Sequence, residues 1–328
     1  MPTVSVVIPV FNGERFIGEA IQSVLGQTLK DLEIIVVNDG STDGTEKAVR
    51  QFSAPVSYYR QENLGAGAAR NFGVAVARAE WIAFLDSDDV WYPGKLAVQL
   101  QHAVACPDRA FFYSDMDTID DNGHLVRKGV LSEKMQRRRR KDTLTALLFD
   151  GLPLPYPSTV LLRKDLFLNS GGFNSLFRWK YHEDAQLFAR IARLCTIHFI
   201  PQSLVQYRIR RGPRVENARI TEGNWPVLLA CLREASRDER ERELLTKAFH
   251  REYSRYLSNQ GKHCLRDGDH TEARRFFRLS FLEYPLHPRN WSRWALSFAP
   301  GLREFYAKHK KLFHLTYSLL SLIDSLCV

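Results

Sequence analysis

The sequence of 328 residues predicts an α/β fold with a mainly parallel central sheet, followed by a helical C-terminal region. In the first part of the chain, apolar β-branched runs of strand length alternate with segments whose apolar residues recur at helical spacing. The links are short, and this alternation favours parallel pairing with right-handed crossovers. From about residue 215 the strand pattern ends, and the chain becomes rich in arginine and aromatic residues. We therefore expect two domains, at residues 1–212 and 213–328.

The first elements can be placed along the chain from these patterns. Val4–Val10 is a β-branched run and predicts the first strand. Apolar residues then recur at helical spacing from Phe16 to Leu25, which predicts a helix that ends near Gln27. The same two patterns predict further strands at 32–37, 56–59, 81–85 and 110–114, and further helices at 65–77 and 93–105.

The later elements are interrupted by an acidic, turn-rich stretch at residues 115–123. After it we expect strands at 158–162, 196–200 and 203–208, and helices at 164–168 and 181–194. Beyond residue 215, Tyr256–Tyr284 resembles one unit of a tetratricopeptide-type helical hairpin. A second copy is not evident, so the sequence does not predict a repeat array.

The composition is that of a globular protein, with 45% apolar and 25% charged residues. The five cysteines are scattered, which indicates a reducing compartment rather than a disulfide or metal framework. Neither a signal-type segment nor an apolar run long enough to span a bilayer is evident. We therefore expect a cytoplasmic location.

The net charge of +9 lies entirely in the last third of the chain. Residues 1–207 carry 23 basic and 23 acidic side chains, whereas residues 208–328 carry 23 basic and 14 acidic ones. This asymmetry suggests an acidic partner for the tail. The run Arg137–Arg140 is compatible with a solvated loop or with a clamp for phosphate or an anionic lipid head group.

The segment Leu312–Val328 is mostly apolar and follows a cluster of three lysines. Two interpretations stay open: a helix that docks on the core, or an interfacial helix that makes peripheral contact with the cytoplasmic membrane. Truncation after about residue 305 distinguishes them. Partitioning into the membrane fraction would fall if the segment is interfacial, and an unchanged fraction would exclude the membrane contact.

Three carboxylates follow the apolar run Trp81–Leu85, at Asp86, Asp88 and Asp89. The run predicts a strand that is buried on both faces. Crowded carboxylates repel one another unless a cation neutralises them, and oxygen ligands favour Mg²⁺ or Mn²⁺. The alternative is a solvated turn with helix caps, since aspartate is favoured in both roles.

Six short motifs occur in an order and spacing that resemble the family 2 glycosyltransferases of the GT-A fold. The motifs are Val6–Asn12, Val37–Asp43, Asn63–Asn71, Leu85–Asp89, Gly171–Phe173 and His182–Asp184. Each motif alone is weak, but the ordered set is specific, and it covers roughly residues 3–210. The C-terminal third shares no motif with the family.

The resemblance implies a transferase that uses a nucleotide-sugar donor and inverts the anomeric centre. Asp39 then matches the carboxylate that accepts from the nucleotide base, with Pro9, Val10 and Asn12 as the backbone rim of that pocket. A helix cap is the alternative role for Asp39. Arg70 follows Gly65 and Gly67 where a dinucleotide-binding loop would have a third glycine, which argues against NAD. Arg70 can neutralise phosphate, or it can form a structural salt bridge.

The same resemblance implies a metal and a general base. Asp88 matches the metal ligand, and Asp86 the residue that contacts the ribose or completes the ligand shell of Mg²⁺ or Mn²⁺. Asp184 matches the base that removes the proton of the acceptor hydroxyl, and Glu183 is expected to face elsewhere. The alternative is that both acids belong to a solvated helix start. Gly171–Phe173 resembles the loop on the acceptor side.

One departure from the family concerns the segment after Tyr207 and Arg208, where many relatives carry a histidine. Here Arg210 or Arg211 is in a position to grip the diphosphate directly, which would lessen the need for a metal. His182 is an alternative, but a lone histidine beside an aspartate is more often structural.

The sequence therefore predicts an inverting, metal-dependent glycosyltransferase of the hexosyltransferase class, with a UDP-sugar as donor. The expected acceptor is a hydroxyl of a surface glycan or lipid-linked glycan. The alternative is a non-catalytic nucleotide-sugar-binding protein with the same fold. Nucleic-acid binding is not expected, because aromatic residues interleaved with Lys and Arg on a sheet face are not evident.

Overall fold

The computed structural model describes residues 1–130, 155–174, 183–209 and 238–284, together with Leu229, Arg233 and Ser236. These residues fall into two compact units, which we describe separately. Residues up to 209 belong to the first unit, and residues 239–284 belong to the second. The boundary expected at residue 212 lies outside the described residues.

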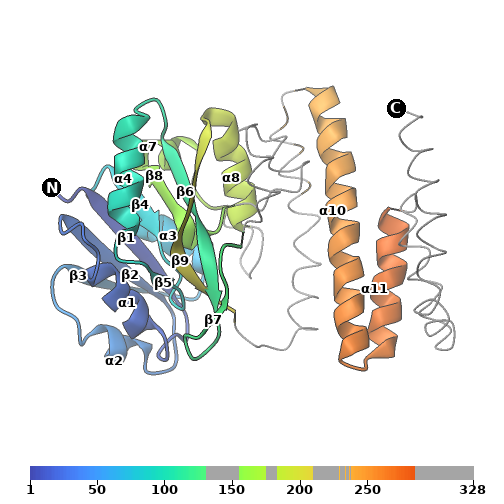
Figure 1. The fold of residues 1–328 in the computed structure, drawn as a ribbon, viewed down its shortest axis with the longest axis horizontal. Coiled ribbons are helices and arrows are strands. Elements are labelled where there is room, and N and C mark those ends of the chain that lie inside the picture. The colour runs from blue at the N-terminus through green and yellow to red at the C-terminus, as the bar shows by residue number, and fades with distance from the viewer. Residues whose placement is uncertain are drawn as a thin grey trace. The chain divides into compact units, whose positions relative to one another are not determined.

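A single twisted sheet forms the centre of the first unit (Figure 1). Its strand order over the described residues is β3-β2-β1-β4-β8-β6-β9-β5, and β7 pairs with β6. The strands are β1 (Val4–Val10), β2 (Leu32–Asp39), β3 (Val56–Gln61), β4 (Trp81–Phe84), β5 (Val90–Trp91), β6 (Phe111–Ile119), β7 (Leu125–Arg127), β8 (Val160–Arg163) and β9 (Ile197–Arg208). Parallel ladders join β3, β2, β1 and β4, and another joins β6 to β9. The predicted α/β fold with a mainly parallel sheet is confirmed.

Helices cover both faces of this sheet. They are α1 (Ile17–Leu25), α2 (Thr45–Val49), α3 (Ala66–Val76), α4 (Lys95–Ala105), α7 (Lys164–Asn169) and α8 (Glu183–Leu194), with a short 3₁₀ helix, η1 (Pro157–Thr159). One hydrophobic cluster unites one face of the sheet with α1, α2 and α4. The other cluster unites the opposite face with α3, α7 and α8. Strands that are buried on both faces explain why their sequences read as unbroken apolar runs.

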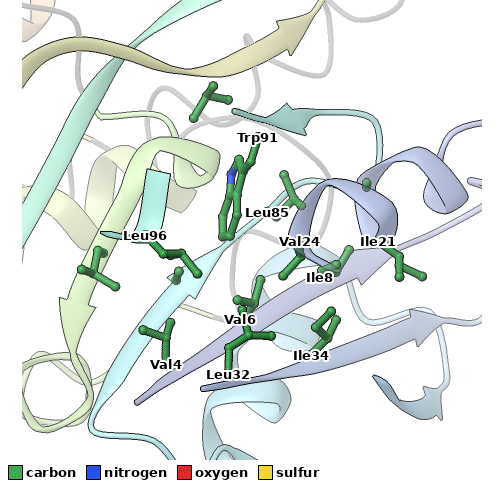
Figure 2. Packing of buried hydrophobic residues seen from close by; sticks show 14 of the residues in the cluster. Val4, Val6, Ile8, Ile21, Val24, Leu32, Ile34, Leu85, Trp91 and Leu96 are labelled. Carbon is green, nitrogen blue, oxygen red and sulfur yellow. The ribbon is translucent and has the colours of Figure 1, made fainter. Parts of the chain in front are cut away.

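The first cluster shows how the alternation of strand side chains builds this packing (Figure 2). Val4, Val6 and Ile8 of β1 share this cluster with Ile21 and Val24 of α1, whereas the intervening Val7 belongs to the other cluster. Successive side chains of a strand point to opposite faces, so β1 contributes to both cores. The spacing of Ile21 and Val24 places both on one side of α1.

Helix α3 lies unusually close to β1. A Cβ atom at Gly73 would lie 2.3 Å from a methyl carbon of Val7, which is closer than two carbon atoms can approach. Only glycine allows this separation at the crossing. Gly73 therefore allows α3 to pack directly against β1.

Two local predictions for the second half are wrong. Residues 115–119, which were expected in an acidic turn, continue β6. Asp117 can be buried there because its carboxylate accepts from the Tyr92 hydroxyl and the Gly129 amide, both at 2.8 Å. The two strands expected at 196–200 and 203–208 form one strand, β9, whose register shifts opposite Ser114–Met116.

The second unit contains a helical hairpin made of α10 (Glu239–Arg266) and α11 (His270–Glu283). The side chain of Asp269 caps α11 by accepting from the amide of Glu272 at 3.0 Å. Leu257, Ala273 and Phe276 are among the buried residues between the two helices. The hairpin occurs where the sequence resembles a tetratricopeptide unit. Two other segments discussed from the sequence, residues 312–328 and the run Arg137–Arg140, lie outside the described residues. Among the residues that the structure does describe, no helix is long and apolar enough to cross a membrane.

Lys95, at the start of α4, is completely buried. Its ammonium group donates to Gln99 Oε1 at 2.7 Å and lies 3.9 Å from the ring centre of Trp91. Burial lowers the pKa of Lys95 well below its ordinary value. Because the unfolded chain then binds this proton at pH values where the folded chain does not, stability rises with pH between the folded and unfolded pKa values.

We expect Lys95→Met to remove this dependence. The free energy of unfolding of the wild type should rise relative to that of Lys95→Met as the pH is raised toward about 10, by at most about 1.4 kcal/mol per pH unit. Urea denaturation across this pH range measures the difference. Lys30→Met, at an exposed lysine, is the matched control. Parallel pH profiles for the wild type and Lys95→Met would contradict a neutral buried amine.

Candidate functional site

The segments that carry the predicted site residues meet at one edge of the sheet. Strands β2, β1 and β4 are parallel neighbours, so their carboxyl ends lie side by side. Val10 ends β1, Asp39 ends β2, and Asp86 follows shortly after β4. In sheets of this kind, ligands bind outside the carboxyl ends of the strands.

The loops after β1 and β2 are joined to each other through Asn12. Its backbone N–H donates to Ser41 Oγ at 2.9 Å, and its side-chain oxygen accepts from the backbone N–H of Thr42 at 2.9 Å. Asn12 has a positive φ of 48°, which asparagine tolerates better than most residues. Pro9 and Val10 are buried within β1, and their role as the backbone rim of a nucleotide pocket stays a prediction.

Asp39 fixes the start of α3. Its carboxylate accepts from the Gln61 side chain at 2.7 Å and from the amides of Leu64 and Gly65 at 2.9 and 2.8 Å. Only 3% of Asp39 is exposed. A carboxylate has about four acceptor positions, so three of them are used by the protein itself. The Asp39 carboxylate thus holds the loop that leads into α3 and does not cap the next helix, α2, whose start has no side-chain cap. Its contact with a nucleotide base stays a prediction.

The acidic turn Asp86–Asp89 contains carboxylates in two different environments. Asp89 is 1% exposed, and it accepts from Ser158 Oγ and from the Arg208 amide. Burial, with the charges of Asp86 and Asp88, raises the pKa of Asp89 well above its ordinary value. Asp86 and Asp88 are only partly buried. The turn therefore combines one buried carboxyl group, that of Asp89, with two carboxyl groups that solvent can reach.

This arrangement fits a divalent cation bound partly by the protein and partly by substrate. Within the described ranges, no group of three or more His, Cys, Asp or Glu side chains could hold a metal ion by itself. Mg²⁺, however, is typically bound by one or two carboxylates together with phosphate oxygens and water. Asp86 and Asp88 match that smaller requirement, and their predicted role as metal ligands stays a prediction.

Arg70 on α3 connects the acidic turn with the start of α8. Its two terminal nitrogens lie 2.6 Å from Asp86 Oδ1 and 3.2 Å from Glu183 Oε1. Its guanidinium also lies 5.2 Å from the ring centre of Phe173. Burial alone would lower the pKa of Arg70, but the charges of Asp86 and Glu183, with a further contribution from Asp184, raise it above its ordinary value. The salt-bridge role considered for Arg70 is therefore present, and phosphate contact stays a prediction.

The first two residues of α8 are Glu183 and Asp184. Glu183 forms an ion pair with Arg70 of α3, and the expectation that it faces away from the direction of Asp184 stays a prediction. The charge of Asp184 also reaches this region. The pKa of Tyr156 is raised first by burial, then by Asp184 and by Asp89. Both acids thus act electrostatically on groups that border the acidic turn, which a fully solvated helix start would not do.

The predicted acceptor-side loop is bound to α3 by its backbone. The amide group of Asn71 donates to the carbonyl of Phe173 and accepts from its N–H, both at 2.8 Å. Gly172 has a positive φ of 64°, and a Cβ atom there would lie 2.7 Å from Asn71 Oδ1. Glycine is therefore required at this position by both conformation and space. Adjacent residues of α3 hold the acidic turn and this loop.

Sequence reasoning missed Arg208 and Ser158 as residues of this site. Arg208 ends β9, and its side chain donates to the carbonyls of Asp88 and Asp120 at 2.8 and 3.0 Å. Arg210 and His182, which were both predicted to be candidates near the diphosphate, lie outside the described residues.

Comparison with known proteins gives a consistent result. Residues 5–170 match the model of the family described as glycosyl transferase family 2. A glycosyltransferase of Rickettsia typhi is 33% identical over 219 residues, which cover 66% of this chain and 67% of the relative. A glycosyltransferase of Nostoc sp. is 31% identical over 212 residues, which cover 63% and 64% of the two chains. The solved structure of S. aureus TarS covers 90% of each chain with a TM-score of 0.58 at 16% identity, a likeness of fold.

The ion pairs of Arg70 lead to a stability prediction. Arg70→Met leaves Asp86 and Glu183 facing each other without their shared cation, and removal of one partner from a buried pair costs about 3–5 kcal/mol. We expect a loss of this size in the free energy of unfolding, measured in urea.

Arg163→Met is the matched control, because the pairs of Arg163 with Glu80 and Asp165 are exposed. Exposed pairs contribute about 0–1 kcal/mol. Equal, small losses in the two variants would show that Arg70 does not hold the site together.

Proposed function

The chain belongs to glycosyl transferase family 2, and from this premise we propose that it is an inverting, metal-assisted glycosyltransferase with a UDP-sugar as donor. The observation that carries the proposal is the position of Arg70, which places the acidic turn and the start of α8 beside each other. Inverting transfer needs both parts in one site: a place for the leaving diphosphate and a base for the acceptor.

Asp184 is the proposed base. In direct inversion the acceptor oxygen attacks C1 of the sugar from the face opposite the nucleotide. The new C–O bond forms as the bond between C1 and the diphosphate breaks, and the electron pair stays on the diphosphate. A carboxylate within reach of the acceptor hydroxyl takes its proton as the oxygen attacks. Asp184 is the acid that matches the base in the family resemblance, and Glu183 beside it forms an ion pair with Arg70.

Asp86 and Asp88 are the proposed residues for Mg²⁺ or Mn²⁺. When bound, the cation would offset the charge that builds up on the leaving diphosphate. Arg70 neutralises part of the charge of Asp86, which reduces the repulsion among the crowded carboxylates of the turn. Arg210 is proposed to contact the diphosphate, which would reduce the dependence on metal.

Asp39 and the loop around Asn12 are the proposed nucleotide pocket. Asp39 has about one acceptor position left beyond its three contacts within the protein, and a base N–H is a suitable donor for it. The choice of UDP is supported by the TarS structure of similar fold, which is a complex with UDP.

A glycan hydroxyl is the proposed acceptor, within cell-surface polysaccharide or lipid-linked glycan synthesis. The support is the basic tail and the apolar segment Leu312–Val328, which would bring the enzyme to an acidic membrane surface. The alternative is a non-catalytic protein that binds a nucleotide sugar. The partly exposed Asp86, Asp88 and Asp184 favour the enzyme.

The test combines UDP release from a panel of UDP-sugars with calorimetric binding of UDP in the presence and absence of Mn²⁺. We expect Asp184→Asn to lower turnover by about 10²–10⁴-fold while UDP binding stays unchanged, because the base acts only in the chemical step. We expect Asp88→Ala to lose both turnover and the Mn²⁺-dependent part of binding, with the fold intact by circular dichroism.

Asp165→Asn, an exposed acid in the first turn of α7, is the control that should retain activity. Normal turnover in Asp184→Asn would remove the proposed base. A wild-type chain that binds UDP but releases none from any donor would favour the non-catalytic alternative.

A further inference from the structure

Ser158 makes an unusual pair of contacts with the acidic turn. Its hydroxyl accepts from the amide of Asp86 at 3.0 Å and donates to Asp89 Oδ2 at 2.5 Å. The turn is also closed by its own bond from the Asp89 amide to the Asp86 carbonyl at 3.1 Å. One buried hydroxyl therefore contacts both ends of the segment that contains Asp88.

The position of Ser158 is in turn fixed by its backbone. Three consecutive carbonyls accept from side chains of one neighbouring segment, residues 91–99. Trp91 Nε1 donates to the Ser158 carbonyl at 2.9 Å, Gln99 Nε2 donates to that of Thr159 at 2.8 Å, and Lys95 Nζ lies 3.5 Å from that of Val160. We call these three donors, Trp91, Lys95 and Gln99, the buried clasp.

The buried clasp is costly to maintain, which suggests that it serves more than stability. Lys95 and Gln99 are completely buried, and Lys95 contacts two neutral groups, the Gln99 side chain and the Val160 carbonyl. Burial of polar groups of this kind is unfavourable unless each is hydrogen-bonded, and an apolar core could hold the same backbone. Directional hydrogen bonds, however, fix a backbone more sharply than apolar contacts do.

We infer that Ser158 is a positioning residue that sets the geometry of Asp86 and Asp88 for the cation and the diphosphate, and that the buried clasp holds Ser158 in place. This inference rests on the proposed function, because it assigns a supporting role within the same site. Residues that orient metal-binding carboxylates typically change metal affinity by 10–100-fold when they are replaced.

The experiment measures the Kd of the full chain for UDP by calorimetry, with and without saturating Mn²⁺. The quantity compared is the ratio of the Kd without Mn²⁺ to the Kd with Mn²⁺. For Ser158→Ala we expect this ratio to fall by at least about tenfold, because Asp86 and Asp89 lose their common partner. The Kd without Mn²⁺ should stay within about twofold of the wild type, since the contacts of Asp39 are untouched.

Thr159→Val is the matched control. Thr159 is the next residue of η1, is equally buried, and its hydroxyl donates only to the Tyr156 carbonyl among the recorded contacts. The ratio should stay at the wild-type value in this variant. A ratio that falls as far in Thr159→Val as in Ser158→Ala would overturn the inference, because the effect would then be a general loosening of η1.

Gln99→Leu provides a second test that leaves the hydroxyl of Ser158 in place. It removes one donor of the buried clasp, and we expect a smaller fall of the ratio in the same direction. Wild-type ratios in Ser158→Ala, or in Gln99→Leu if Ser158→Ala does not fold, would contradict the inference alone. A wild-type chain whose UDP affinity does not respond to Mn²⁺ would contradict the metal-assisted mechanism as well.

Discussion

The guanidinium of Arg70 is the contact on which the site depends. It is almost completely buried, and it lies between Asp86 of the acidic turn and Glu183 at the start of α8. These two acids are separated by almost a hundred residues of sequence, and without a cation between them they would repel each other. Arg70 satisfies both with one planar group that presents several donors at fixed angles.

Helix α3 extends this role to the whole edge of the sheet. Its start is held by Asp39, its Arg70 holds the acidic turn and α8, and its Asn71 holds the backbone of Phe173. The helix can do this because Gly73 allows it to lie directly against β1. A buried ionic network of this type contributes little net stability, because desolvation offsets most of the attraction. What it provides is a defined geometry between the proposed donor side and acceptor side.

Much of the fold was predictable because its signals are local. Unbroken apolar strands such as Val4–Val10 and helical spacing in Ile17–Leu25 each record burial in the sequence itself. The approach of Asp39 and Asp86 also follows from topology, since parallel neighbours end at the same edge. The motif order identified the family, which the match over residues 5–170 confirmed.

The parts that could not be predicted depend on contacts between distant segments. Asp117 looked like a turn residue, because its partners Tyr92 and Gly129 are not evident from its neighbours. Ser158 and Arg208 belong to no motif, yet they hold the acidic turn through a side-chain hydroxyl and a backbone amide. The sequence around Glu183 likewise gives no sign that its partner is Arg70, a buried arginine on another helix.

The central claim is that the acidic turn and the start of α8 form one site across Arg70. The most direct measurement is a crystal structure of the chain with UDP and Mn²⁺, in which the anomalous signal locates the metal. We expect one manganese ion at Asp88, beside the diphosphate, with the carboxylate of Asp184 facing the side of the diphosphate where the sugar would lie. A manganese ion bound elsewhere, or Asp184 turned away from the bound nucleotide, would contradict it.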